Sequence, residues 1–426
     1  MSQRSGVPAD GEPIHDPFAA KDRLFGHDEI GDPASRLAEL RSECPIHAGS
    51  ISKKFGVEGF DTLLYPEHSQ YSVFSFEAVD AVLRRGADFS STYSSKPLRE
   101  VIGRTILEMD APDHHRFRML IQPAFTKSEI ERWEHTFVRS IVDEYIDGFI
   151  DAERCDLASD FAFRYPIHVT AVTAGLPLEG LDDFYRQAVI WTNPAADEHT
   201  RRAAAAELGD AIQGVVDERR RDPGDDLISV LIAAEFRDPE GSGRHVLTDE
   251  EIVAFMRLLV PAGAQTTYRA LTSALHLLLS HPTQLQRLRD DPTLIPPAVE
   301  EALRLEPPLT TAGRLCLADT DLLGRAIPAG SAVNLSLAAA NRDPERWDDP
   351  DRFDPERPPI GHLSFGQGPH ICLGIHAARM ELRVAIEQLL TRLPNLRFDP
   401  DHEPAGISGL VYRTALSLPV RWEPVS

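Results

Sequence analysis

Apolar residues recur at helical spacing through the middle of the chain and alternate with polar residues near its ends. Helical spacing, with apolar side chains returning every three or four residues, predicts helices over 128–150, 181–191 and 201–220. Alternation typical of strands occurs over 71–76, 332–340 and 416–422. The pattern predicts a mainly α fold with small β-sheets (α+β), in which a helical body carries a small sheet lobe.

The longest predicted helix begins at Thr248 and ends before Pro282. Thr248 and Glu251 have the spacing of a capping box, and apolar residues then recur up to the proline. Such a helix would be roughly 50 Å long at 1.5 Å per residue. Pro261 lacks an N–H group and two threonines can bond back to nearby carbonyls, so we expect a kink or bulge over 262–267.

Length and composition favour one large globular domain. With 426 residues, 42% of them hydrophobic, the chain can bury a sizeable core. Because no low-complexity linker or fixed-period repeat marks a boundary, we expect a flexible N-terminal arm over 1–20 and a single domain over 21–426. The arm lacks the apolar core of a leader, and no run reaches the ~18 apolar residues of a membrane span. We therefore expect a cytoplasmic monomer without membrane contact.

The charge of the chain excludes one class of partner. The formal net charge is -23, from 44 basic and 67 acidic residues. Because phosphate backbones are bound by basic surfaces, this balance argues against a nucleic-acid partner. Local basic patches remain compatible with it.

Four cysteines lie far apart in the sequence, and only Cys372 has a distinctive context. No C-x-x-C pair occurs, so neither a zinc knuckle nor a disulfide framework is indicated. Cys372 is approached through Gly366 and Gly368 and is followed by Gly374, just before a predicted helix. These glycines indicate that the backbone around the sulfur must come close to something.

Three interpretations of Cys372 compete. A nucleophile needs a base, and His370, two positions away on a tight loop, is poorly placed to accept the thiol proton. An inert core thiol would not explain the glycines. A metal ligand explains more, because backbone N–H groups at a helix N-terminus stabilise a thiolate and glycines let a flat cofactor approach the backbone.

The loop around this cysteine resembles the haem-binding loop of the cytochrome P450 family. The family pattern is Phe-Gly-x-Gly-x-His-x-Cys-x-Gly, and every fixed position is matched, by Phe365, Gly366, Gly368, His370, Cys372 and Gly374. The resemblance extends from about residue 109 to the C-terminal strand. Glu301 and Arg304 are similar to the family's Glu-x-x-Arg pair, and Arg357 is similar to a further arginine of the same ion-pair cluster.

The resemblance implies a haem b cofactor with Cys372 as the axial thiolate ligand of its iron. It also implies basic residues converging on the two haem propionates, namely His114, Arg118, Arg314 and His362, with His370 as a further candidate. Further contacts with the cofactor are expected from Ala262, Gly263, Phe365 and Gly366.

The family's chemistry is activation of O2 to hydroxylate a moderately hydrophobic small molecule. Steroids, terpenoids, fatty acids and polyketides are the substrate classes that the resemblance suggests, with contacts expected from 93–103, 190–204, 309–311 and 408–411. Because the chain has no Gly-x-Gly-x-x-Gly nucleotide fingerprint, we expect its electrons from a separate ferredoxin or flavodoxin. Candidates for docking an acidic donor are Arg116, Arg379 and Arg383.

One position departs from the family pattern. The expected catalytic pair on the long helix is an acid followed by an alcohol, and here the alcohol is Thr266 while the acid is replaced by Gln265. An amide orients water but does not take up and release a proton at neutral pH. Gln265 therefore keeps one alternative to an O2-dependent hydroxylase open, a peroxide-using or otherwise atypical haem-thiolate oxidase. A haem-binding sensor without turnover is a further alternative, against which the retained Thr266 argues.

Overall fold

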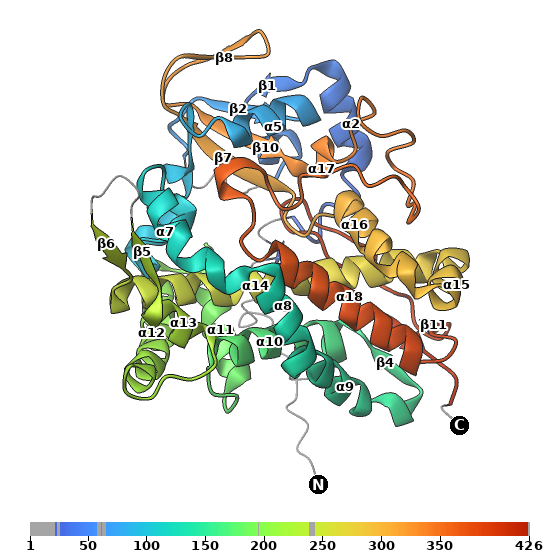
Figure 1. The fold of residues 1–426 in the computed structure, drawn as a ribbon. Coiled ribbons are helices and arrows are strands. Elements are labelled where there is room, and N and C mark those ends of the chain that lie inside the picture. Colours follow the sequence, from blue (N-terminus) through green and yellow to red (C-terminus); the bar gives the residue numbers. More distant parts are fainter. Residues whose placement is uncertain are drawn as a thin grey trace.

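The computed structural model describes residues 22–23, 26–57, 61, 65–194, 196–237 and 243–424. The predicted arm over 1–20 lies outside them. A helical body makes up most of the molecule, and a smaller lobe built around a sheet lies at one end (Figure 1). This arrangement confirms the predicted mainly α fold with small β-sheets.

The helices occupy the following bounds: α2 Ala34–Glu43, α3 Ile51–Lys54, α5 Phe76–Arg84, α6 Ser95–Ile102, α7 Asp113–Ile121, α8 Lys127–Trp133, α9 Arg139–Asp147, α10 Tyr165–Ala174, α11 Leu181–Thr192, α12 Glu198–Arg221, α13 Leu227–Ala233, α14 Asp249–Ser280, α15 Pro282–Asp290, α16 Ile295–Leu305, α17 Leu337–Ala340 and α18 Ile375–Arg392. Short 3-10 or π segments are η1 Ser91–Ser94, η2 Ile106–Glu108, η3 Gln122–Phe125, η4 Glu134–Val138, η5 Ile150–Ala152, η6 Ala158–Ala162, η7 Pro292–Leu294 and η8 Gly368–His370.

The strands are β1 Ile46–Ala48, β2 Gln70–Val73, β3 Phe89–Ser90, β4 Arg154–Asp156, β5 Glu235–Arg237, β6 Arg244–Val246, β7 Thr311–Cys316, β8 Thr320–Leu322, β9 Arg325–Ile327, β10 Ala332–Ser336, β11 Arg397–Phe398 and β12 Pro419–Arg421. The lobe's sheet has the order β1-β2-β10-β7-β3, with β2 and β10 parallel. A second sheet, β11-β12-β4, joins the C-terminus to the helical body.

Two predicted strands end earlier than their alternation suggested. The strand predicted over 332–340 stops at Ser336, whose hydroxyl accepts a hydrogen bond from the Ala339 N–H at 3.2 Å and begins α17. The strand predicted over 71–76 stops at Val73, because Ser75 caps α5 in the same way. In both cases a serine cap converts an apolar run into a helix.

Helix α14 runs through the centre of the body and packs against α10, α11, α12, α16 and α18 (Figure 1). Its 32 residues begin at the predicted capping box of Thr248 and Glu251 and end one residue before His281. Pro261 lies inside the helix, and α14 continues without interruption across 262–267. The predicted kink or bulge over 262–267 therefore does not divide the helix, and one element can position residues at both of its ends.

A buried ion-pair cluster joins α16 to the loop before α18. Arg304 donates to both carboxylate oxygens of Glu301, at 2.7 and 2.8 Å, and Arg357 donates to the same carboxylate at 3.0 Å. Glu301 and Arg304 are 4% and 2% exposed. The predicted contacts within this cluster are confirmed, and they hold in place the segment that leads to Cys372.

Candidate haem-thiolate site

Cys372 lies between η8 and the start of α18, where Gly374 is the N-cap residue. Its N–H donates to the carbonyl of Phe365 at 2.8 Å, which closes the loop on itself. Burial raises the pKa of the thiol, while a hydrogen bond from the Gly374 backbone and the charge of Arg118 act in the opposite direction. The side chain is nevertheless accessible to solvent. A group that is surrounded by protein and still accessible lines a recess inside the fold.

Two different constraints require glycine in this loop, backbone conformation and close packing. Gly366 and Gly368 have φ of 67° and 72°, in the left-handed region that favours glycine. A Cβ on Gly368 would lie 2.5 Å from the carbonyl oxygen of Leu83, at the end of α5. Gly368 is therefore required by packing of the loop against α5, and the sequence interpretation that it admits a cofactor is not needed for this position.

Basic residues from three separate elements converge beside the loop. The rings of His114 on α7 and His370 in η8 lie 4.0 Å apart, centre to centre. Burial, with the charges of neighbouring basic groups including Arg314 on β7, lowers the pKa of His114 to about 4 and that of His370 to about 3. Burial also lowers the pKa of Arg314 to about 10, opposed by the charge of Asp110. Because these basic groups disfavour positive charge on one another, their cluster is suited to bind an anion.

Arg118 attaches α7 to the cysteine loop. Its guanidinium donates to the carbonyls of Pro369 and Ile371, at 3.2 and 2.9 Å, and to the side chain of Gln122 at 3.3 Å. The predicted residues His114, Arg118, Arg314, His370 and Cys372 are thus brought together. The sequence did not reveal these contacts, through which Arg118 fixes the backbone directly before the cysteine.

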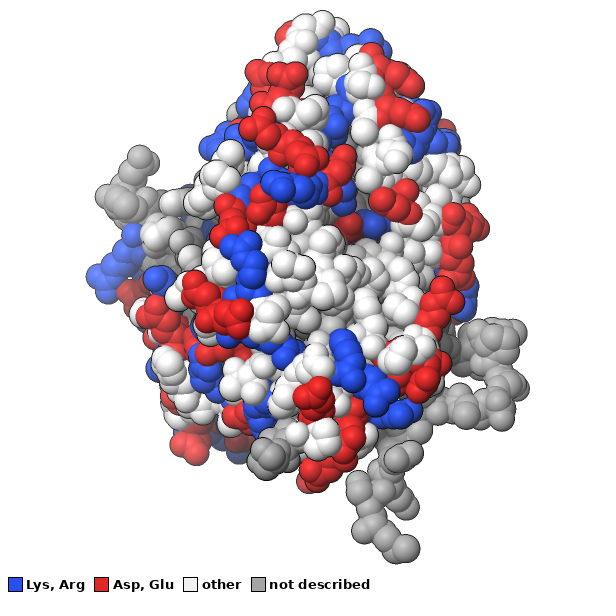
Figure 2. Space-filling view, turned by 90° about the vertical axis from the view of Figure 1, so that its right-hand side faces the viewer, with Lys and Arg blue, Asp and Glu red and all other residues white. Residues whose placement is uncertain are grey.

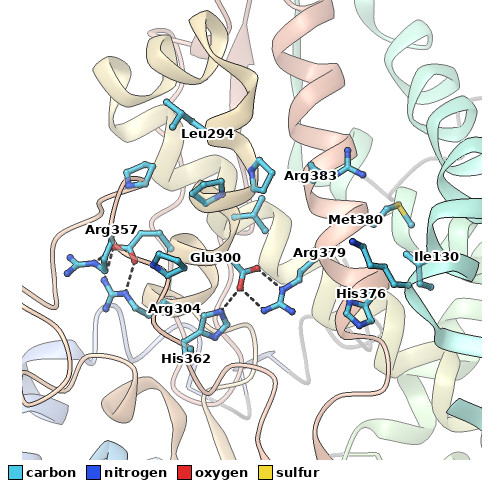
Figure 3. Close-up of a pocket in the computed structure, with 18 of the residues that line it drawn as sticks. Ile130, Leu294, Glu300, Arg304, Arg357, His362, His376, Arg379, Met380 and Arg383 are labelled. Carbon is cyan, nitrogen blue, oxygen red and sulfur yellow. Dashed lines mark hydrogen bonds and ion pairs between the residues drawn. The ribbon is translucent and has the colours of Figure 1, made fainter.

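His362 takes part in a different set of contacts. Its Nε2 lies 3.4 Å from a carboxylate oxygen of Glu300, and Arg379 donates to the same carboxylate at 2.7 and 2.6 Å (Figure 3). These contacts lower the pKa of Glu300 to about 2 against the effect of burial. In the structure His362 therefore contacts a carboxylate of this chain, and its contact with a propionate stays a prediction.

Two acidic residues of this region were not predicted from the sequence. Glu300 directly precedes the motif residue Glu301. This pair of adjacent carboxylates was the signal in the sequence that could have indicated a second ion pair. Asp110 accepts hydrogen bonds from the Ser90 hydroxyl and, at 2.9 Å, from the Ser91 N–H, which hold it near Arg314. No local spacing links residues 90 and 110 to β7, so this contact depends on the fold.

One side of α14 offers small residues at the position predicted for oxygen activation. Ala262 is exposed, and Gly263 and Thr266 are half-buried, whereas Gln265 is 5% exposed. The Thr266 hydroxyl donates to the Ala262 carbonyl at 2.7 Å. Its proton is thereby engaged, and its lone pairs can accept a hydrogen bond from a ligand.

Two of the four predicted substrate-contact segments lie side by side. Leu309 forms a β-bridge with Tyr412, and the Thr310 N–H donates to the Val411 carbonyl at 3.0 Å. Of the other two segments, the side chains of residues 94–98 and residue 195 lie outside the described residues. This pairing places residues 309–311 next to residues 408–411.

The residues present fit haem. A thiol lies in a recess, basic groups beside it favour an anion, and the Nε2 of His114 is buried without a hydrogen-bond partner among the described residues. These are the features needed by an iron ligand and by a donor to a propionate. When bound, a haem with a thiolate ligand activates dioxygen for attack on C–H bonds.

This site defines a haem-thiolate protein. Residues 180–407 match the family model described as Cytochrome P450, and the chain belongs to the cytochrome P450 family. It is a monooxygenase, an oxidoreductase with haem b as cofactor. The Cytochrome P450 monooxygenase PikC of Streptomyces venezuelae is 35% identical over 93% of each chain. The Mycinamicin IV hydroxylase/epoxidase of Micromonospora griseorubida is 36% identical over 91% of this chain and 95% of its own.

Solved structures show the same fold. The crystal structure of P450BioI in complex with an acyl carrier protein ligated to hexadec-9Z-enoic acid has a TM-score of 0.80 and 31% identity. That similarity covers 92% of this chain and 99% of P450BioI. In the described part of the chain, no helix combines the length and the apolar character needed to cross a membrane.

Proposed function

We propose that this P450 hydroxylates a moderately hydrophobic small molecule of the polyketide, steroid, terpenoid or fatty-acid type, in the cytoplasm and as a monomer. The observation that carries the proposal is the geometry of the site: a thiol in a recess beside an anion-binding cluster, and a side of α14 with the small residues Ala262 and Gly263. The names of relatives support the substrate class, since one hydroxylates mycinamicin IV and another is a vitamin D(3) 25-hydroxylase.

The cofactor contacts are part of this proposal. Cys372 would ligate the iron. The propionates would be met by His114 and Arg118 from α7, Arg314 from β7, His362 from the loop before η8, and His370 from η8. Arg118 would keep the cysteine loop in register. We assign contacts with the ring to Ala262, Gly263, Phe365 and Gly366.

The electrons would come from a separate ferredoxin or flavodoxin. Of the three arginines expected to dock it, Arg379 is paired with Glu300, and Arg383 with Glu134 and Glu387. Arg116 lies 3.8 Å from Asp113. Basic and acidic side chains mix on the side of α15, α16 and α18 (Figure 2). Donor binding should therefore depend less steeply on salt than an unpaired basic patch would require.

Proton delivery would rely on Thr266 with ordered water, without a titrating group at position 265. Gln265 is 5% exposed, so a proton crossing this position must be relayed inside the protein. An amide side chain does not take up and release protons, so Gln265 cannot return a proton to such a relay. We expect Gln265→Glu to raise the amount of product formed per reductant consumed. Where protonation limits turnover, it should also raise the turnover rate by ~100-fold. Thr266→Ala should act in the opposite direction and increase waste of electrons as peroxide.

The experiment begins with the substrate. Purified holoenzyme is titrated with a library of steroids, terpenoids, fatty acids and polyketides while the haem absorbance is followed for displacement of water from the iron. Product and reductant are then measured with the best binder. Product formation with a ferredoxin or flavodoxin system supports the proposal. Turnover with hydrogen peroxide alone would favour the atypical oxidase that Gln265 suggests, and haem binding without product from any binder would favour a sensor.

A further inference from the structure

An arginine on α14 without a partner lies at a cavity away from the cysteine. Among the described residues, Arg257 makes no hydrogen bond or ion pair, and its Nε is buried. Burial lowers the pKa of its guanidinium, opposed by the charge of Asp210 at a distance beyond an ion pair. A half-buried cation without a partner costs free energy unless a ligand satisfies it.

The neighbouring helix α12 is shaped around this side chain. A Cβ on Gly209 would lie 1.6 Å from Nη2 of Arg257 and 2.2 Å from its Cζ. Gly209 is buried inside α12, where glycine is unfavourable by about 1 kcal/mol relative to alanine. The close approach gives this glycine a reason, because only the absence of a side chain lets the guanidinium cross the helix.

The cavity at this arginine has a volume of about 410 Å³ and lies between α6, α12 and α14. Its apolar wall includes the buried side chains of Ile102, Val253 and Ala254. Arg257 and Ala262 are five residues apart, which places them about 140° apart around the helix. The cavity therefore lies on a different side of α14 from the residues assigned to oxygen activation.

The charged groups around the cavity limit its ligand. Arg104 lies at the cavity but is paired with Asp113, and Glu251 accepts from the Thr248 N–H in the capping box. Asp210 and Glu250 are exposed, so water screens their effect on a ligand bound at Arg257. Arg257 is then the one cation of the cavity, within the described residues, that lacks a carboxylate partner.

We propose that this cavity is a second binding site, which takes the carboxylate of an apolar monocarboxylic acid on Arg257 and its hydrocarbon chain on the apolar wall. A guanidinium matches a carboxylate with two parallel hydrogen bonds. The volume lies within the ~300–1,000 Å³ of small-molecule sites. Because three elements meet here, an occupied site would hold α6 and α12 against α14.

Sodium decanoate is the probe, and holoenzyme whose iron is already ligated by a tightly bound azole is the protein. The azole fills the reaction chamber, so calorimetry on this complex reports the second site alone. We expect decanoate to bind, and decanol to bind more weakly. Arg257→Gln should weaken decanoate by ~10-fold or more, the value of one charge-assisted hydrogen bond, without changing decanol.

A second variant separates loss of the site from loss of the fold. Gly209→Ala displaces only the tip of a flexible side chain, and it should weaken decanoate while the haem spectrum stays that of wild type. Arg221→Gln, which removes an exposed arginine that donates to the Asp217 carbonyl on the same helix, is the matched control and should bind as wild type. Absence of decanoate binding to the azole complex would overturn the proposal, as would equal affinities in wild type and Arg257→Gln.

Discussion

Glu381 is a buried carboxyl group on α18, the helix that begins after Cys372. It is 7% exposed, and its Oε2 has no hydrogen-bond partner within the described residues. Burial raises its pKa from the ordinary value of 4.5 to about 8. The folded protein therefore holds this proton more tightly than the unfolded chain does.

The sign of the effect on stability follows from this difference. The contribution of Glu381 is fully present below its unfolded pKa of 4.5 and is lost as pH rises through about 8. At 1.36 kcal/mol per pKa unit, the free energy of unfolding should fall by about 4 kcal/mol between about pH 5 and about pH 9 from this group alone. Glu381→Gln keeps the shape and removes the titration.

The assay is urea unfolding of holoenzyme at a series of pH values, followed by tryptophan fluorescence. Between about pH 5 and about pH 9, we expect the free energy of unfolding of Glu381→Gln to rise by about 4 kcal/mol relative to that of wild type. The control is Glu387→Gln, a partly exposed carboxylate of the same helix that accepts from Arg139 and Arg383. A wild-type-to-Glu381→Gln difference that stays flat with pH, or that moves against the variant at high pH, would refute the reasoning.

Two further predictions concern the framework of the site. Glu301→Gln leaves two buried arginines without their carboxylate, so it should cost about 3–5 kcal/mol in urea unfolding, whereas Glu356→Gln, which breaks an exposed pair with Arg287, should cost less than about 1 kcal/mol; equal costs would contradict the burial argument. Gly368→Ala forces a Cβ against the Leu83 carbonyl and should reduce the fraction of haem with thiolate ligation, while Gly361→Ala, with open space around it, should not; an unchanged fraction in Gly368→Ala would show that the loop does not need this packing.

Local chemistry predicted much of the fold. The capping box at Thr248 and Glu251 and the stop before Pro282 depend on nearest neighbours along the chain, and the structure has α14 between them. The end of β10 at Ser336 was missed because a serine in an apolar run suits a strand or a helix cap equally, and here it caps α17.

In the candidate site, too, some contacts could be predicted from the sequence and others depend on the fold. The family pattern brought His114, Arg314 and Cys372 into one prediction, and the structure has His114 close to Arg314 and to Arg118, which in turn is close to Cys372. The contact of His362 with Glu300 was not predictable, because it depends on how α16 faces the loop before α18. The packing of Gly368 against α5 likewise joins residues far apart in sequence.

The most direct test of the account is the absorbance spectrum of the reduced carbon monoxide complex. Wild type and Cys316→Ala, which removes a buried thiol elsewhere in the chain, should both show the red-shifted band of a thiolate-ligated haem. Cys372→Ala should lose it, and Cys372→His should lose it even where haem is retained, because imidazole donates less charge than thiolate. An intact red-shifted band in Cys372→Ala would contradict the assignment of this sulfur as the iron ligand, and with it the site described around α18.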